Sequence, residues 1–211
     1  MTMKLYGDKK SGNCYKIQLL LAFLRRPYEW VDVDMTKNES RSADFLRLNP
    51  VGEIPLLELD DGRCVPESNA ILCYLAEGTP FLPADPWARV QALRWMFFEQ
   101  NNHVTSVAAA RFILHHLRRP EHLEQKLQEK LAAGNSALEQ MERHLGAQEW
   151  FAGDGCTVAD ISLYAYTHVA EQSGFDLARF PRLRGWLERV RAMPGYVAMD
   201  DGPLVWPERA A

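Results

Sequence analysis

The chain has 211 residues, of which 47% are hydrophobic and 25% charged, and its formal net charge at pH 7 is -4. This length accommodates one large or two modest domains, and the composition is typical of a globular protein. The negative charge, without a basic run interleaved with aromatics, argues against nucleic acid as a partner. The apolar stretches are shorter than a membrane span and the first ten residues lack a signal-peptide core, so we expect no membrane partner.

The cysteines and histidines also limit the possible functions. The four cysteines are scattered, and together with the six histidines they form neither a CxxC motif nor a paired ligand spacing. The pattern therefore predicts a reduced, cytoplasmic protein with no metal cofactor.

The first part of the chain predicts a strand, a helix and a second strand. Residues 3–6 and 28–34 have the composition of strands, and apolar residues at helical spacing begin at Cys14 and end before Pro27. Two parallel strands need such a crossover helix between them.

A hairpin and a helix follow. The Asp61-Gly62 pair is the expected centre of the hairpin turn, and a helix is expected over 68–78 with Ser68 as its N-cap. The order βαβ then ββα matches a thioredoxin-like α/β layout.

The second part of the chain predicts helices throughout. Pro86 suits the first position of a long helix, and Thr157 with Asp160 forms a capping-box-like pair before another. The result is an all-helical bundle. The predicted division is an N-terminal domain over residues 1–78, a linker over 79–85 and an all-helical domain over 86–211.

The segment NPVGEIPLLELDDGRCVPESNAILCYLAE, residues 49–77, resembles the glutathione-binding half of a cytosolic glutathione transferase. In that family a turn of the NPxGxxP kind precedes a strand that begins with a cis-proline, here Pro55. A hairpin follows, and an acidic residue and a serine then open a helix, here Glu67 and Ser68. The resemblance extends over nearly the whole chain. It implies the glutathione transferase fold, a thioredoxin-like domain followed by an all-α bundle.

The resemblance implies that glutathione is the co-substrate. The implied glutathione-binding residues are Arg41, Glu53, Ile54, Pro55, Glu67 and Ser68. A helix N-terminus favours an anion, here the γ-glutamyl carboxylate beside Ser68, and Glu67 would meet the ammonium. Ser68 could instead be only a helix cap, and Arg41 only a surface cation. Glu53 departs from the family pattern, because many members have a cation or an amide there.

The stretch SGNCYK, residues 11–16, resembles the active-site start of the Ser-type classes theta, phi and zeta. That resemblance makes Ser11 the catalytic hydroxyl, five positions before Lys16, with Asn13 assisting. Cys14 is the alternative, and it would give disulfide chemistry through a mixed disulfide with glutathione. Tyr6 is expected to face the other side of the first strand and to pack.

In this family the second substrate lies against the first helices of the second half. The implied candidates for the electrophile site are His103, Val107, Arg111, Phe112 and His115. Trp95, Phe97 and Phe98 are expected to build the core or subunit contacts, and the family implies a homodimer.

The sequence therefore favours a detoxification enzyme that joins the glutathione thiolate to a small hydrophobic electrophile. A glutathione-dependent disulfide reductase or thiol transferase is one alternative. A non-catalytic interaction module of the same fold is another. The tail, residues 200–211, either covers the site or lies free.

Overall fold

The computed structural model describes residues 2–199, which fall into two compact units. The first contains residues 2–77 and 194–199, and the second is Gly78–Met193. The sequence pattern assigns 194–199 to the helical domain, and the structure corrects this: the Tyr15 hydroxyl donates to the Val197 carbonyl at 2.7 Å, within the first unit. The tail 200–211 lies outside the described residues.

The first unit is built on a four-stranded sheet with the order β2-β1-β3-β4. β1 pairs in parallel with β2 and antiparallel with β3, and β3 pairs antiparallel with β4. The βαβ-ββα order read from the sequence is confirmed. The elements are β1 Lys4–Gly7, α1 Gly12–Phe23, β2 Glu29–Asp32, the 3-10 helices η1 Met35–Lys37 and η2 Glu39–Arg41, α2 Ala43–Leu48, β3 Leu56–Glu58, β4 Cys64–Pro66 and α3 Ser68–Ala76.

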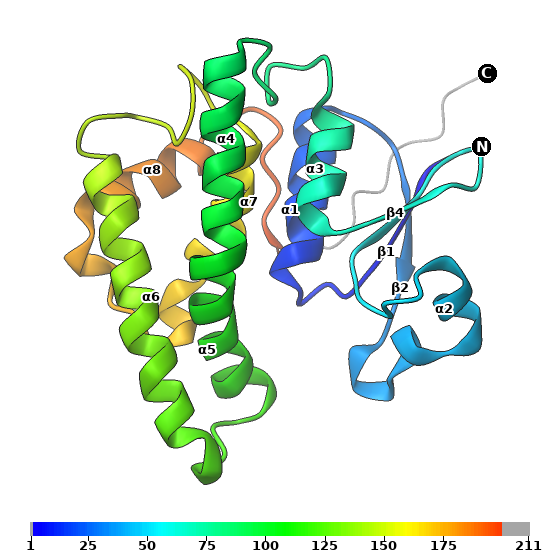
Figure 1. The fold of residues 1–211 in the computed structure, drawn as a ribbon, viewed down its shortest axis with the longest axis horizontal. Helices are drawn as coiled ribbons and strands as arrows, with labels where there is room; N and C mark the ends of the chain where they lie inside the picture. The colour runs from blue at the N-terminus through cyan, green and yellow to red at the C-terminus, as the bar shows by residue number, and fades with distance from the viewer. Residues whose placement is uncertain (1, 200–211) are drawn as a thin grey trace. The chain divides into compact units, whose positions relative to one another are not determined.

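The two faces of this sheet are covered by different helices (Figure 1), with α1 and α3 on one face and α2 on the other. Alternation along β1 explains the arrangement, because Leu5 and Gly7 are buried toward α1 while Tyr6 packs edge-on against Phe45 of α2, with ring centroids 6.1 Å apart. The predicted packing role of Tyr6 is confirmed.

The hairpin turn between β3 and β4 differs from the prediction. The Gly62 N–H donates to the Leu59 carbonyl, and the Leu59 N–H donates to the Arg63 carbonyl. Asp60 and Asp61 are therefore the central residues, and Gly62 follows them at φ +84°. This is a three-residue loop with glycine in the left-handed position, a common alternative to the two-residue turn.

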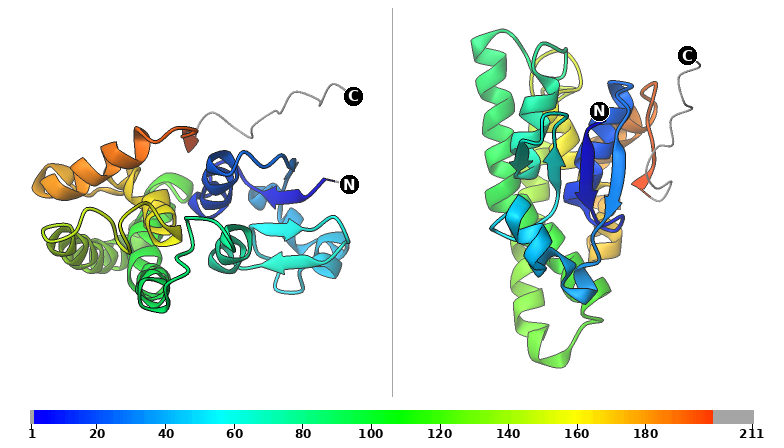
Figure 2. Two further views of the ribbon diagram at one scale, coloured as in Figure 1. Left: turned by 90° about the horizontal axis from the view of Figure 1, so that it is seen from above. Right: turned by 90° about the vertical axis from the view of Figure 1, so that its right-hand side faces the viewer.

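The second unit is entirely helical (Figures 1 and 2). Its elements are α4 Pro86–Phe98, the π-helical segment η3 Glu99–Ala108, α5 Ala109–Arg111, a second π-helical segment η4 Phe112–His116, the 3-10 helix η5 Glu121–Leu123, α6 Glu124–His144, α7 Val158–Thr167, the 3-10 helices η6 Ala170–Ser173 and η7 Leu177–Arg179, and α8 Pro181–Arg191. Within residues 2–199 no helix is both long and apolar enough to cross a membrane.

The helix starts in this unit follow the sequence signals. Pro86 begins α4, and the Asp85 carboxylate accepts from the Ala88 N–H at 2.8 Å. The Thr157–Asp160 capping box is confirmed. The Asp160 carboxylate also accepts from the indole N–H of Trp186, a fully buried residue of α8, at 3.0 Å. The capping box thus ties the start of α7 to the core.

Candidate active site

Ser11 is the N-cap of α1. Its backbone is extended, and its Oγ accepts a hydrogen bond from the Cys14 N–H at 3.4 Å. Because capping uses the oxygen only as an acceptor, the hydroxyl can also donate a hydrogen bond, and the Cys14 thiol is one acceptor within its reach. The half-buried side chain therefore presents a donor at the positive end of a helix dipole.

Cys14 lies one turn further along α1 and is fully buried. A Cβ atom built on Gly7 would meet the Cys14 Sγ at 2.7 Å, so the thiol packs directly against β1. Burial raises the pKa of the Cys14 thiol to about 11, although hydrogen bonding from Ser11 opposes the shift. A thiol with this pKa is almost wholly protonated at neutral pH, and the reactive form of cysteine is the thiolate.

Asn13 stands between these two residues in the first turn of α1. Its side chain is half-buried, and its Oδ1 atom is buried without a hydrogen-bond partner among the described residues. A buried acceptor left without a donor costs roughly 1–3 kcal/mol and is uncommon. The amide oxygen is thus able to accept a donor from a bound molecule.

Tyr6 does not present its hydroxyl to this site. The phenol donates to the Glu58 carboxylate at 2.6 Å, across the β1–β3 ladder. Burial and the neighbouring Glu58 carboxylate raise the pKa of Tyr6. The group is therefore a neutral packing residue with a satisfied donor, in agreement with its predicted orientation.

The Ile54–Pro55 peptide bond is cis, as the family resemblance implies. The sheet ladder begins only at Leu56, so the half-buried Ile54 lies just outside it. The turn before it is held by the Asn49 side chain, whose Nδ2 donates to the Glu53 carbonyl at 2.8 Å. This turn fixes the backbone of Ile54 just before the start of β3.

Arg41 and Glu53 flank the same turn. The exposed Arg41 side chain donates through Nη1 to the Val51 carbonyl at 2.7 Å. Gly52 has φ +69°, and a Cβ there would meet the Arg41 Nη1 at 2.7 Å. The Arg41 side chain can therefore pack against the turn only because residue 52 has no Cβ atom. The Glu53 side chain is exposed, and the hydrogen bond from Asn49 goes to its backbone carbonyl and not to its carboxylate.

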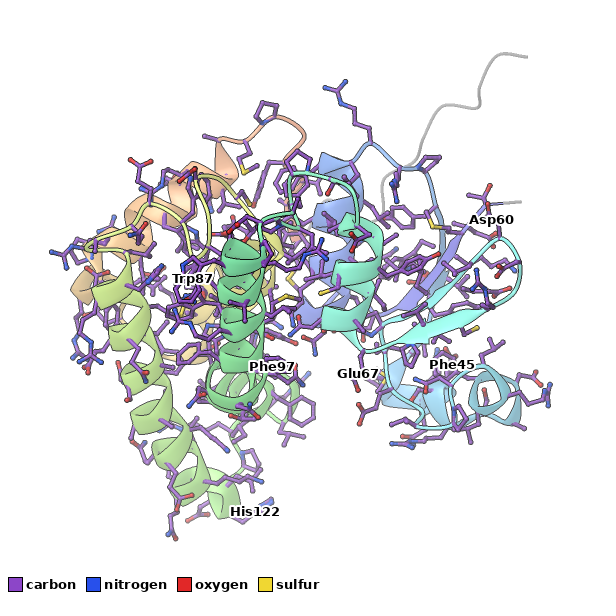
Figure 3. The ribbon with its side chains drawn as sticks, turned by 45° about the horizontal axis from the view of Figure 1, so that its top comes forward. Phe45, Asp60, Glu67, Trp87, Phe97 and His122 are labelled. Atoms are coloured by element: carbon purple, nitrogen blue, oxygen red, sulfur yellow. The ribbon has the colours of Figure 1, made fainter. Side chains whose placement is uncertain are left out.

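The start of α3 differs from the prediction in one position. Glu67, not Ser68, is the N-cap, and it makes no capping hydrogen bond through its side chain. Glu67 has φ +68° and ψ 112°, a conformation that non-glycine residues rarely adopt and that costs about 1–3 kcal/mol. The exposed Glu67 side chain lies at the junction of β4 and α3 (Figure 3). Ser68 becomes the first helical residue.

Ser68 is buried, and its hydroxyl contacts a lysine. The Lys16 Nζ donates to the Ser68 Oγ at 3.2 Å and to the Asn69 Oδ1 at 3.4 Å. Lys16 is on α1 and is fully buried. The sequence marks Lys16 only as a landmark for Ser11. A single cation within the largely apolar run YKIQLLL is the signal that could have drawn attention to it.

The five electrophile-site candidates separate into two groups in the second unit. His103 and Val107 are fully buried, and the His103 Nε2 is 2.9 Å from the Thr167 hydroxyl. These two side chains lie in the helical core and have no exposed surface. Phe112 and His115 are exposed, and the half-buried Arg111 donates to the Gln172 side chain at 3.3 Å. Among the described residues no cluster of three or more His, Cys, Asp or Glu side chains could hold a metal.

Comparison with known proteins gives matches across both units. The family model of the glutathione S-transferase N-terminal domain matches residues 1–77, and that of the C-terminal domain matches residues 101–194. The crystal structure of a glutathione S-transferase from Pseudomonas fluorescens has a TM-score of 0.93 and 46% identity, covering 94% of this chain and 99% of that one.

Two curated relatives have different activities in their names. Maleylacetoacetate isomerase of Pseudomonas aeruginosa is 30% identical over 208 residues, covering 92% of this chain and 93% of the relative. Disulfide-bond oxidoreductase YfcG of Escherichia coli is 30% identical over 198 residues, covering 86% of this chain and 87% of the relative. One name denotes an isomerase and the other a disulfide-bond oxidoreductase, so the two relatives do not indicate one common reaction.

Proposed function

This chain belongs to the glutathione S-transferase family, and on that premise we propose that it transfers the thiolate of glutathione to a small hydrophobic electrophile. The observation that carries the proposal is the Ser11 hydroxyl at the start of α1. Its oxygen accepts in the cap, and its hydroxyl, which hydrogen-bonds to the Cys14 thiol in the absence of a ligand, would donate to the sulfur of a bound thiol instead.

Thiolate formation is the chemical task of this donor. A free thiol has a pKa of about 8.5, so only a few per cent is ionised at pH 7. A decrease of about two units requires about 2.7 kcal/mol of preferential thiolate stabilisation. One hydrogen bond to a charged sulfur, together with the helix dipole, supplies an energy of that size. Asn13 assists through its buried amide, which can accept an N–H group of the bound peptide.

The remaining glutathione contacts are proposed at the residues just before β3 and at the start of α3. The Ile54 backbone, fixed by the cis bond to Pro55, would pair with the cysteinyl segment as an added strand does. The γ-glutamyl carboxylate would bind at Ser68 and the ammonium at Glu67. The strained backbone of Glu67 supports this role, because such strain is typical of ligand-binding positions. Arg41 and Glu53 are proposed for the glycyl end.

For the second substrate we keep the three candidates with accessible or half-buried side chains. Phe112 offers an apolar surface, and Arg111 and His115 are one helical turn apart. A cation and an imidazole beside an exposed aromatic ring suit an acceptor with an apolar body and a polarisable group.

A homodimer is part of the same proposal. Trp87, Val90 and Phe97 are 72%, 47% and 67% exposed, and their spacing places them on one face of α4. Large apolar side chains exposed in a row are typical of an interface. Sedimentation equilibrium is expected to give twice the chain mass, and a monomer mass would remove this part of the proposal.

Disulfide reduction by glutathione is the second candidate, favoured by the similarity to the oxidoreductase YfcG. In that reaction the glutathione thiolate would attack a disulfide sulfur and release a thiolate leaving group. The buried Cys14, with its raised pKa, is unsuited to be the attacking group, so the reaction would also depend on Ser11. The two candidates therefore share one thiolate site and differ in the acceptor.

The test is a titration of bound glutathione by its thiolate ultraviolet absorbance, with native protein and with Ser11→Ala. We expect the bound thiol to ionise about two pH units below free glutathione in the native protein, and the shift to be lost in Ser11→Ala. Ser42→Ala is the matched control, because Ser42 caps α2 in the same way, accepting from the Phe45 N–H at 3.2 Å.

Three results would change the proposal. Glutathione that binds but ionises independently of Ser11 would contradict the catalytic role of this residue. If Ser42→Ala changed the ionisation of bound glutathione as much as Ser11→Ala does, the effect would be attributed to the loss of a helix cap and not to a contact with sulfur. No binding to the native protein would favour an interaction module of the same fold.

A further inference from the structure

Lys16 is an unusual residue for its place in the fold. It lies in the middle of α1 with no exposed surface, among buried neighbours such as Tyr15 and Ile17. A lysine ammonium is rarely buried without a role, because its desolvation is unfavourable. Its Nζ donates to the hydroxyl of Ser68 and the amide oxygen of Asn69, the first two residues of α3.

The chemistry of this contact determines the direction of the Ser68 hydroxyl. An ammonium group has only donors, so the Ser68 Oγ must be the acceptor in the bond at 3.2 Å. The single hydroxyl proton of Ser68 must then point elsewhere. Ser68 follows Glu67, whose side chain does not cap the helix, so the first-turn N–H groups are not capped by that side chain. The hydroxyl proton and these N–H groups lie at the same helix start.

We propose that Lys16 is a positioning residue that makes Ser68 a hydrogen-bond donor and so selects a carboxylate at the start of α3. The proposal rests on the proposed function, in which the γ-glutamyl carboxylate of glutathione binds there. Lys16 does not touch the ligand in this role. It acts through Ser68, by holding the Ser68 Oγ as an acceptor so that the hydroxyl proton is directed to the ligand.

The test measures the dissociation constants of glutathione and of its analogue with a carboxamide in place of the γ-glutamyl α-carboxylate. Four proteins are compared: native, Lys16→Met, Ser68→Ala and the double variant. Lys16→Met is expected to weaken glutathione binding by about 10- to 100-fold, the value of a hydrogen bond to a charged group. It should also reduce the preference for the carboxylate over the carboxamide by a similar factor.

The double variant separates positioning from a general structural effect. If Lys16 acts through Ser68, then Lys16→Met should have little further effect in the Ser68→Ala background. For Lys16→Met alone, KM for glutathione should rise while kcat at saturating glutathione remains near the native value, because Ser11 still forms the thiolate. Gln18→Leu is the matched control: it removes another buried polar side chain from α1, and its glutathione affinity should be native.

Each outcome has a distinct meaning. Unchanged affinity in Lys16→Met, or additive effects of Lys16→Met and Ser68→Ala, would overturn the role of Lys16 while leaving the proposed function intact. Failure of the native protein to bind glutathione would overturn the proposed function and this role with it. If Lys16→Met does not fold, Lys16→Gln, whose amide keeps N–H donors and removes the charge, is measured in the same cycle. It should keep most of the carboxylate preference, because the amide can still donate to the Ser68 Oγ, and complete loss of the preference would overturn the positioning role.

Discussion

The starts of α3 and α7 use similar residues for opposite purposes. At α7 the Thr157 and Asp160 side chains satisfy each other's backbone groups, and Asp160 also accepts from the Phe151 N–H and the Trp186 indole. At α3 the N-cap side chain makes no such bond and the N-cap backbone is strained. A helix start that is closed from within contributes to stability, whereas one left open can hold an anion.

The same contrast applies to the charges buried behind the two helices. Asp160 is fully buried and receives hydrogen bonds from the backbone, a hydroxyl and an indole of its own unit. Lys16 is equally buried but is directed to the hydroxyl of a proposed ligand-binding serine. Changes at α7 should therefore alter stability with little effect on binding, and changes at α3 should do the reverse.

The largest effect is expected from Asp160→Ala. The substitution leaves the N–H groups of Phe151, Thr157 and Trp186 without their acceptor, and each buried orphan donor costs roughly 1–3 kcal/mol. We expect the free energy of unfolding in urea to fall by about 3–5 kcal/mol. Asp85→Ala, which removes a single exposed cap from α4, is the control and should cost about 1 kcal/mol. Equal losses in the two variants would contradict the structural role of Asp160.

The pH dependence of stability should show the same carboxyl group. Burial raises the pKa of Asp160 from 3.8 to about 6, despite the hydrogen bonds that oppose the shift. The native state therefore holds a proton that the unfolded state releases between pH 4 and 6. This contribution to stability is fully present below pH 4 and is lost as the pH rises through 6, by up to about 3 kcal/mol.

Other groups titrate in the same pH range, so the Asp160 contribution must be measured as the difference in stability between two proteins. Burial lowers the pKa of His144. The contribution of His144 to stability is therefore lost as the pH decreases, whereas that of Asp160 is lost as the pH increases. The comparison of native protein with Asp160→Asn, each unfolded in urea at pH values from 4 to 7, isolates the Asp160 contribution. Parallel curves for the two proteins would show that Asp160 does not titrate in this window.

The smallest effect is expected at Glu67, and it should have opposite signs for stability and binding. Glycine adopts the positive φ of this position without strain, so Glu67→Gly should raise the free energy of unfolding by about 1 kcal/mol. Glutathione binding should weaken, because the proposed partner of the ammonium is lost. Denaturation and binding measurements on one preparation test both signs, with Glu149→Gly as a control at an exposed position outside the proposed site and without a positive φ. A variant that binds glutathione normally would remove Glu67 from the site.

Local signals in the sequence predicted much of the fold. Alternation, helical spacing and Pro86 gave the strands and helices to within a few residues, and the Thr157–Asp160 pair identified the start of α7. The sequence did not show α2, because a helix of six residues has too few turns to display a period. It also misplaced the hairpin centre, since two loop lengths suit the same DDG segment.

For the candidate site, the sequence by itself located the starts of α1 and α3 to within about two residues and identified the proline that precedes β3, because these depend on near neighbours in the chain. Only the tertiary structure decided which side chains are accessible. It buried Cys14 behind Gly7 and His103 beside Thr167, and it brought Lys16 to Ser68 across 52 positions. Such contacts depend on how helices and strands pack, and packing between distant segments leaves no periodic signal in a single sequence.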